Sequence, residues 1–436
     1  MTSESAAARP WANAAPGAAP RARLRHSFGW TLAGNGFYAA AQWALVVVLA
    51  RLGSPEALGT YALALALTAP PFLLAGLHLR ASQATDAARA FRFGDYLGVR
   101  IAGMAAALGG LVVLEAFSGR HIAISTVILA VAAAKAVEGV SDVHHGALQQ
   151  RERMRPIAIS LAVRGALSVL ALAAVLAAGG SLLAAVGTMA VAWALVLASY
   201  DVPAAGAALR ETGESRRPRL DRAAASRLVV ISFPLGLVMM LVSLRVNVPR
   251  YFLERWVGAA GLGTFAAVAS LLVAGGLVVN ALGQAATPRL AALHLGGERA
   301  AFRALVLKLL ALACGLGIAG VAVAAVAGEP ILLLLFGARF TGHADLLVLL
   351  MAAGIPANAA SILGFALTAA RRFTVQLPVF AGTTAVCAAL CLRLVPSQGL
   401  RGAALAWGGA MALEAAAVGV LLARALRPVR SGRRPT

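Results

Sequence analysis

The stretch LARLGSPEALGTYALA, residues 49–64, recurs in altered form as LERWVGAAGLGTFAAV, residues 253–268. Both copies carry an L-G-T-aromatic-A run with an arginine upstream. The second copy starts 204 residues after the first. The identical pairs are Leu49/Leu253, Arg51/Arg255, Leu58/Leu262, Gly59/Gly263, Thr60/Thr264 and Ala62/Ala266. A repeat at this spacing predicts a fold made of two similar halves.

The composition around this repeat is that of a membrane protein. Of the 436 residues, 60% are hydrophobic and 13% are charged, and the mean hydropathy is +0.83. Soluble domains carry about 45–50% apolar and about 25% charged residues. Apolar runs long enough to cross a bilayer are expected at about 28–50, 57–79, 97–118, 121–143, 157–178, 181–200, 228–249, 258–282, 304–327, 345–369, 374–395 and 402–423.

These runs are too continuous for strands that alternate apolar and polar residues, and a bilayer leaves no water for unpaired backbone groups. The predicted fold class is therefore an all-α polytopic membrane protein with about 12 transmembrane helices. The polar run RETGESRRPRLDR, residues 210–222, divides these spans six and six. Since six is an even number, both lobes have the same orientation and are related by a pseudo-two-fold axis along the membrane normal.

The predicted organisation has five parts. They are a disordered cytoplasmic tail at 1–27, a six-helix lobe at 28–200, a cytoplasmic linker at 201–227, a second six-helix lobe at 228–423 and a basic cytoplasmic tail at 424–436. Repeats of this kind surround a central cavity in transporters, where the halves rock against each other. Duplication that only builds a bundle stays open as the alternative.

The net charge of +21 is concentrated in alternate loops. Arginine clusters occur at Arg21, Arg23 and Arg25, at Arg151, Arg153 and Arg155, at Arg216, Arg217 and Arg219, and at Arg427, Arg430, Arg433 and Arg434. Because basic loops stay on the cytoplasmic side, both termini are expected in the cytoplasm. Aromatic residues make up only 6%, which argues against the basic and aromatic platform of a nucleic-acid binder.

Polar residues inside the spans are the candidate site. A charge at the centre of a transmembrane helix costs about 2.5–3.5 kcal/mol. Lys135, Glu138, Asp142, His145 and Gln149 step by three or four residues and fall on one stripe of a helix. The stripe predicts a polar wall of a translocation path. In the alternative, Lys135 and Glu138 neutralise each other, while Asp142 and His145 reach the inner headgroups.

Six further residues are considered, each with two interpretations. Arg245 suits a pyrophosphate, or it extends to outer headgroups. Glu414 suits ion coupling, or it bonds a neighbouring helix. Asn35, Gln42 and Asn280 suit sugar hydroxyls, or they join helices. For Arg164, extension of the side chain to the lipid headgroups is slightly favoured over binding of a ligand. We find no metal-ligand spacing, no nucleophile–base pair and no cofactor motif, so neither metal, cofactor nor enzymatic activity is expected.

Four stretches resemble the polysaccharide flippases of the MOP (multidrug/oligosaccharidyl-lipid/polysaccharide) exporter superfamily. They are SFGWTLAGNGFYAAAQWALVVVLARLGSPEALGTYALALALTAP at 27–70, HLRASQATDAARAFRFGDYLGVR at 78–100, GALQQRERMRP at 146–156 and EPILLLLFGARFTGHADLLVLLMAAGIP at 329–356. The resemblance implies a V-shaped bundle in the bacterial cytoplasmic (inner) membrane. It also implies, as substrate and partner, a lipid-linked oligosaccharide of undecaprenyl-diphosphate type. Polymerase or export machinery stays open as a further partner. Members often have up to fourteen spans, and this chain lacks the extra pair.

The leading hypothesis is thus a flippase for surface polysaccharide biosynthesis that works by alternating access. A MATE-like small-molecule or drug antiporter of the same architecture is the alternative, although few acidic residues lie within the spans to bind a cation. A membrane scaffold without transport activity is the third hypothesis. It would tolerate loss of the polar stripe but not of its surface.

Overall fold

The computed structural model describes residues 20–86, 88–371 and 375–426, which form helices and connecting turns without a strand. The first half holds α1 (Pro20–Leu52), α2 (Pro55–Gly76), α3 (Leu79–Thr85), α4 (Phe93–Ala116), α5 (Ile122–Gln150), α6 (Met154–Ala177), α7 (Leu182–Val196), the π-helical η1 (Leu197–Asp201) and α8 (Val202–Arg210). The second half holds α9 (Arg222–Trp256), α10 (Gly258–Ser270), α11 (Leu272–Leu295), α12 (Arg299–Phe336), the 3-10 turn η2 (Ala338–Phe340), α13 (Ala344–Ala369) and α14 (Gln376–Ala425). The all-α membrane fold expected from the composition is confirmed.

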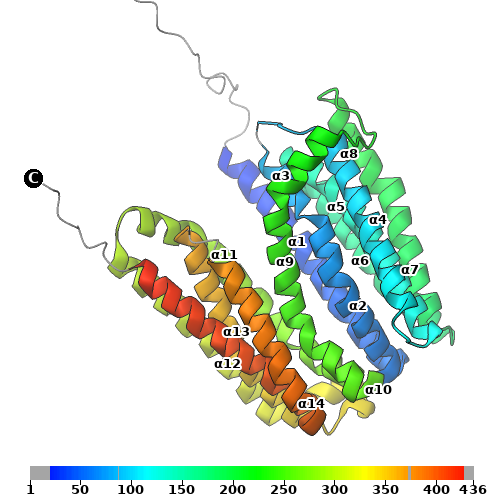
Figure 1. Cartoon of the computed structure of the whole chain (residues 1–436), viewed down its shortest axis with the longest axis vertical. Helices are drawn as coiled ribbons and strands as arrows, with labels where there is room; N and C mark the ends of the chain where they lie inside the picture. The colour runs from blue at the N-terminus through cyan, green and yellow to red at the C-terminus, as the bar shows by residue number, and fades with distance from the viewer. Residues whose placement is uncertain (1–19, 87, 372–374, 427–436) are drawn as a thin grey trace, which may run out of the picture.

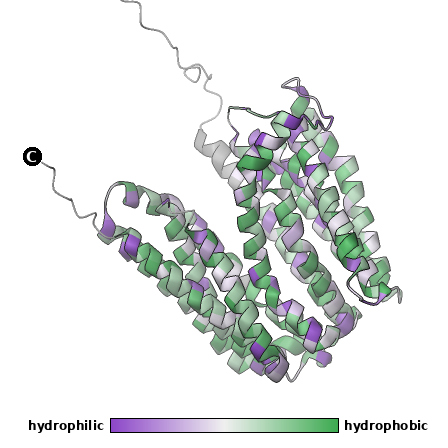
Figure 2. Ribbon diagram, viewed as in Figure 1, coloured by the Kyte–Doolittle hydropathy of each residue, from purple (hydrophilic) through white to green (hydrophobic). Residues whose placement is uncertain are grey.

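The helices form two bundles that lie close together at one end and spread apart at the other (Figure 1). We call these the closed end and the open end. The described chain begins at the open end with α1 and finishes there with α14. Hydrophobic residues make up most of the length of the helices (Figure 2). Large apolar side chains such as Leu32, Val230 and Val326 are exposed. A surface of this kind suits lipid rather than water.

The number of spans depends on α14. Within the described residues, ten helices are long and apolar enough to cross a membrane, or eleven when α10 and α11, bent by 47°, count as one span. As a straight helix, the 50 residues of α14 would measure about 75 Å, far more than the hydrocarbon core of about 30 Å. A break at Gly399, where φ is 54°, divides α14 into two helices.

Two contacts show that the chain reverses direction at Gly399. A Cβ atom added at Gly402 would lie 2.2 Å from the carbonyl oxygen of Leu394. Thr383 Oγ1 lies 3.3 Å from Glu414 Oε2, although the two residues are 31 positions apart in sequence. The α14 segment is therefore an antiparallel pair, and counting it as two spans raises eleven to twelve. Twelve spans match the number expected from the apolar runs.

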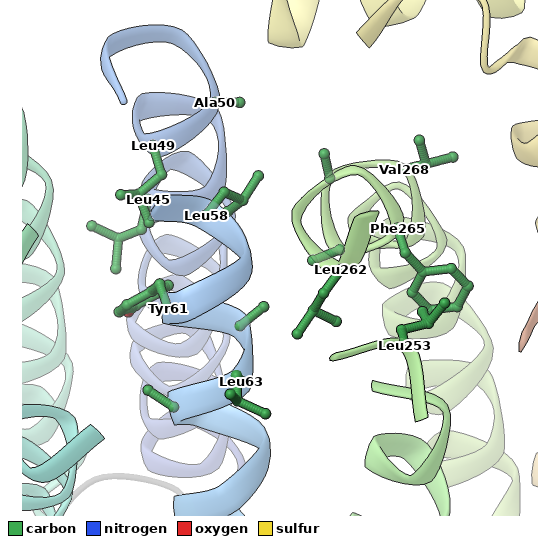
Figure 3. Close-up of a cluster of buried hydrophobic side chains, with 14 of the residues drawn as sticks. Leu45, Leu49, Ala50, Leu58, Tyr61, Leu63, Leu253, Leu262, Phe265 and Val268 are labelled. Atoms are coloured by element: carbon green, nitrogen blue, oxygen red, sulfur yellow. The ribbon is translucent and has the colours of Figure 1, made fainter. Parts of the chain in front are cut away.

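The repeated stretches meet each other at the closed end. Leu58 and Tyr61 of α2 and their counterparts Leu262 and Phe265 of α10 belong to one apolar core (Figure 3). A Cβ atom at Gly59 would lie 1.8 Å from the carbonyl oxygen of Ala259. A Cβ atom at Gly263 would lie 1.9 Å from the carbonyl oxygen of Pro55.

These two contacts are reciprocal, because Pro55 and Ala259 occupy equivalent positions of the repeat, as Gly59 and Gly263 do. A reciprocal contact is what a two-fold axis produces. The pseudo-two-fold axis therefore passes between Gly59 and Gly263. Only glycine lets the backbones of α2 and α10 approach this closely, which explains why both copies keep it.

Two arginines join the lobes at the same end. Arg51, at the end of α1, donates Nε to Leu335 O at 3.1 Å and Nη2 to Leu333 O at 3.1 Å. The last carbonyl groups of a helix have no partner within the helix, and a cation there also complements the helix dipole. Arg339 returns the contact by donating Nη1 to Gly53 O at 2.8 Å. Each lobe thus caps a helix end or adjoining turn of the other.

A proline in α2 creates a further contact between the lobes. Pro70 has no N–H group, so the carbonyl of Ala66, four residues earlier, lacks its helical donor. The hydroxyl of Tyr251, on α9, donates to Ala66 O at 2.5 Å. The Tyr251 hydroxyl of α9 therefore supplies the hydrogen bond that Pro70 cannot donate within α2.

The polar segment between the halves is shorter and more ordered than the expected linker at 201–227. Helix α8 extends to Arg210, so only residues 211–221 connect the lobes. This segment lies on the start of α4, where a Cβ atom at Gly98 would be 2.1 Å from the carbonyl oxygen of Arg219. Arg151 Nη2 also lies 2.9 Å from Glu214 Oε1. The connection is therefore attached to the first lobe.

The chain ends also differ from the expected tails. Residues 20–27, which fall within the expected N-terminal tail, belong to α1. Residues 1–19, and 427–436 of the expected basic tail, lie outside the described residues.

Candidate functional site

The interior of the first lobe contains a group of charged and aromatic side chains, which we call the first-lobe cluster: Lys135, Glu138, Tyr38, Arg164 and Trp193. Lys135 Nζ lies 2.7 Å from Glu138 Oε2. The hydroxyl of Tyr38 donates to Glu138 Oε1 at 2.8 Å. The predicted Lys135–Glu138 contact is present, and residues from α1, α5, α6 and α7 surround it.

Arg164, from α6, gives this cluster its charge. Its guanidinium lies over the rings of Tyr38 and Trp193, with centroid distances of 5.3 and 5.4 Å. The side chain is buried, and its Nε atom has no hydrogen-bond partner among the described residues. Two cations, Lys135 and Arg164, thus face the one carboxylate of Glu138. Counted over its own members, the cluster carries one more positive than negative charge, and the neighbouring carboxylate of Asp201 is engaged by His145 and Ser141.

The second lobe contains a neutral counterpart, the second-lobe cluster: Arg245, Glu414, Phe380 and Thr383. Arg245 of α9 forms an ion pair with Glu414 of α14. The guanidinium also lies over the ring of Phe380, at 5.3 Å from the centroid, and Thr383 donates to Glu414. Both charged residues were candidates for separate roles, and the structure brings them together.

The polar stripe predicted on α5 divides between different neighbours. Asp142 does not join Glu138 but bridges two arginines, with 3.2 Å to Arg80 Nη1 and 3.3 Å to Arg100 Nη2. Gln149 accepts from Arg80 Nε at 2.9 Å. These residues form a separate group nearer the open end.

His145, the remaining member of the stripe, is buried inside the lobe. Its Nε2 atom lies 3.3 Å from Asp201 Oδ1 and 3.1 Å from Ser160 Oγ. A nucleophilic triad needs the serine and the aspartate on different ring nitrogens, whereas here both contact the same nitrogen. The grouping therefore joins α5, α6 and η1 and has no triad geometry.

The amide residues are dispersed. Asn35 donates Nδ2 to Thr31 O of its own helix at 2.8 Å and is exposed. Nε2 of Gln42 is buried without a hydrogen-bond partner among the described residues. Asn280 accepts from Ser361 at 3.2 Å, which joins α11 and α13. These three residues do not meet in one site.

Sequence reasoning missed Arg80, Arg100 and Asp201. The two arginines lie at the ends of predicted spans, where basic residues are ordinary, so helical spacing did not mark them. Asp201 was assigned to the linker. The signal available for it was Pro203, which cannot donate to the carbonyl of Ser199 and which accompanies the π-helical turn at Asp201.

Among residues 20–86, 88–371 and 375–426, no group of three or more His, Cys, Asp or Glu side chains is arranged to hold a metal ion. Apart from Glu138 and Glu414, the members of both clusters are cationic, aromatic or hydroxyl-bearing. Such groups recognise anions and sugar surfaces through charge-assisted hydrogen bonds and stacking.

The chain is similar to known proteins both in sequence and in fold. Residues 24–294 match the family described as "Polysaccharide biosynthesis protein". The capsular polysaccharide biosynthesis protein CapF of Staphylococcus aureus is 24% identical over 382 residues, which cover 87% of this chain and 94% of CapF.

Two solved structures share the fold. A multidrug resistance MATE family transporter in an inward-facing conformation has a TM-score of 0.72 at 12% identity, with 89% of this chain and 94% of that chain covered. The lipid II flippase MurJ in an inward closed conformation has a TM-score of 0.71 at 12% identity, with 91% and 87% covered.

The chain is a multi-pass helical membrane protein, and it shares its fold with a transporter of the MOP superfamily and with a lipid II flippase. The chain belongs to the polysaccharide biosynthesis protein family, and the expected resemblance to its flippases is confirmed.

Proposed function

We propose that this protein moves a lipid-linked oligosaccharide with a diphosphate headgroup across the bacterial cytoplasmic membrane for surface polysaccharide synthesis. Both chain ends lie in the cytoplasm in this proposal, so the open end faces the cytoplasm. The observation that carries it is the uncompensated positive charge of Lys135 and Arg164 against Glu138. A cation inside a membrane protein needs an anionic partner, and a diphosphate supplies one.

The arrangement of the lobes supports alternating access. The contacts of Gly59, Arg51 and Tyr251 join the lobes at the closed end. At the open end, α11 to α14 diverge from the first lobe, while the start of α9 stays packed on it (Figure 1). Each of the contacts at the closed end is a close backbone approach or a few side-chain hydrogen bonds to backbone carbonyl groups. They can therefore separate without unfolding either lobe, and the closed end opens when they do.

Glu414 remains our candidate for ion coupling, in company with Arg245. The anionic headgroup competes with Glu414 for the Arg245 guanidinium, and a carboxylate released in this way becomes available to a coupling ion. Asn280, Asn35 and Gln42 remain candidates for contacts with sugar hydroxyls. A drug antiporter, the alternative function, would bind cations, and the positive first-lobe cluster argues against it.

The test separates the charge of the first-lobe cluster from its geometry. Lys135→Met removes the uncompensated charge, and we expect surface polysaccharide to fall at least about tenfold, the loss of one charge-assisted hydrogen bond. Lys135→Met/Glu138→Gln leaves Arg164 alone and restores a charge of plus one. We therefore expect the double variant to recover part of the surface polysaccharide that the single variant loses, when both are present in the membrane at the same level.

Normal export by Lys135→Met would contradict the role given to the charge of the first-lobe cluster, and normal export by cells that lack the protein would contradict the proposed function. Equal loss in the single and double variants would show that the ion pair itself, rather than the net charge, is required. Thr188→Val, an exposed position on α7 whose hydroxyl only returns to Ala184 O, serves as the control for membrane insertion.

A further inference from the structure

A small notch lies between α1 and α6 near the open end of the first lobe. Its volume is about 300 Å³, counting the part that is open to solvent. The polar side is lined by Trp30 and Asn35 of α1, Arg80 of α3 and Gln149 of α5. The apolar side is lined by Ile157 and Leu161 of α6. A cation, amides and an aromatic ring thus surround a space with an apolar wall.

Gly34 creates the floor of the notch. A Cβ atom at this position would lie 2.6 Å from the Cα atom of Ala158. The absent side chain lets α1 approach α6 at this level, while Trp30 and Asn35 extend on either side. The notch is therefore a consequence of a close helix crossing and does not depend on a loop.

Arg80 is held in place by its neighbours. Nε donates to Gln149 Oε1 at 2.9 Å and Nη1 to Asp142 Oδ1 at 3.2 Å. Within the described part of the chain, Nη2 of Arg80 donates to no protein group. The guanidinium is thus oriented in advance and keeps a free pair of N–H groups.

The charges beside the notch do not balance. Asp142 is shared between Arg80 and the buried Arg100, so two guanidinium groups face one carboxylate. One positive charge remains, and Arg80 is the more accessible of the two arginines, with 28% of its side chain exposed against 6%. The group therefore attracts an anion to the Arg80 side.

We propose that this notch binds a phosphoryl group of a lipid diphosphate, with Arg80 as its donor. The inference rests on the proposed function and adds an early docking position to it. Gln149 and Lys135 lie on the same helix, 14 residues or about 21 Å apart. A headgroup held by Arg80 at the open end then passes Asp142 and reaches the first-lobe cluster.

The experiment measures binding to the purified full-length protein in detergent micelles. The probes are inorganic pyrophosphate, farnesyl diphosphate and phosphatidylglycerol. Arg80→Gln and Asn35→Asp are the test variants. Asn35→Asp places a negative charge at the notch without touching the Arg80–Asp142 contact, so it remains informative if Arg80→Gln folds poorly. Arg153→Gln is the control, because Arg153 pairs with Glu211 at the same end but outside the notch.

We expect farnesyl diphosphate to bind the wild type and to bind Arg80→Gln and Asn35→Asp about 10- to 100-fold more weakly. Arg153→Gln should bind as the wild type does. Equal affinity in all four proteins would overturn the proposal. Phosphatidylglycerol that competes as well as farnesyl diphosphate would overturn the assignment to a diphosphate and identify a phospholipid headgroup instead.

Failure of this inference differs from failure of the proposed function. If Lys135→Met blocks export while Arg80→Gln binds and exports normally, the notch is refuted and the function stands. If diphosphate binding depends on Arg80 while cells that lack the protein export polysaccharide normally, the proposed function fails and the notch stands.

Discussion

At the residue scale, Arg245 and Glu414 depend on each other for charge compensation. Glu414 is 3% exposed, so removal of its partner leaves a carboxylate inside the second lobe. Breaking a buried pair in this way costs about 3–5 kcal/mol, whereas removing both charges together costs much less.

Arg245→Gln is therefore expected to lower the melting temperature strongly, and Arg245→Gln/Glu414→Gln should recover most of it. Melting is followed by tryptophan fluorescence of the purified protein. The double variant also tests transport, since it should fold but fail to export polysaccharide. A double variant that melts no higher than the single one would show that the pair is not the source of the loss.

At the element scale, α2 and α10 cross through Gly59 and Gly263. A methyl group at Gly59 meets the carbonyl oxygen of Ala259 and forces the two backbones apart, at a cost of about 1–3 kcal/mol. Gly59→Ala is expected to weaken the closed end and to favour a conformation in which it is open.

Spin labels at Leu52 and Trp256, which are exposed and equivalent in the repeat, report the separation in a background without the three native cysteines. The distance distribution should move to larger values in Gly59→Ala. Gly109→Ala is the control, because a Cβ atom there meets nothing within 4 Å. An unchanged distribution would contradict a gating role for this crossing.

The contact of α9 with α2 permits a double-mutant cycle. Tyr251→Phe leaves the carbonyl of Ala66 without its donor and is expected to cost about 1–3 kcal/mol. Pro70→Ala restores an N–H group four residues after Ala66. In the Pro70→Ala background, Tyr251→Phe should leave the free energy of unfolding nearly unchanged. Chemical denaturation measures both effects, and equal costs in the two backgrounds would disprove the compensation.

At the scale of the whole molecule, the arrangement of the loops predicts the topology. The described chain begins and finishes at the open end, and the turn after α6, near Gly179, lies at the closed end. A fluorescent protein fused to the C-terminus should therefore fluoresce in the cytoplasm. Alkaline phosphatase fused after Gly179 should be active outside. The opposite pair of results would place the open end outside and reject the proposed direction of loading.

The sequence by itself determined the class of fold. Apolar runs of sufficient length must be helices in lipid, because backbone groups find no other partners there. The repeat at Gly59 and Gly263 predicted two related lobes, and the structure confirms the relation through the reciprocal contact of these glycines. The break at Gly399 was also predicted, because it falls between the apolar runs expected at 374–395 and 402–423.

Only the tertiary structure decided which charges meet. Helical periodicity places Lys135, Glu138, Asp142 and His145 on one stripe, yet each finds its partners on different neighbours: α1 and α6 for the first-lobe cluster, α3 and α4 for Asp142, and η1 for His145. The pairing of Arg245 with Glu414 could not be predicted from helical periodicity either, because the two residues lie on different helices. Periodicity defines the faces of a single helix, whereas partner choice depends on how helices distant in sequence cross.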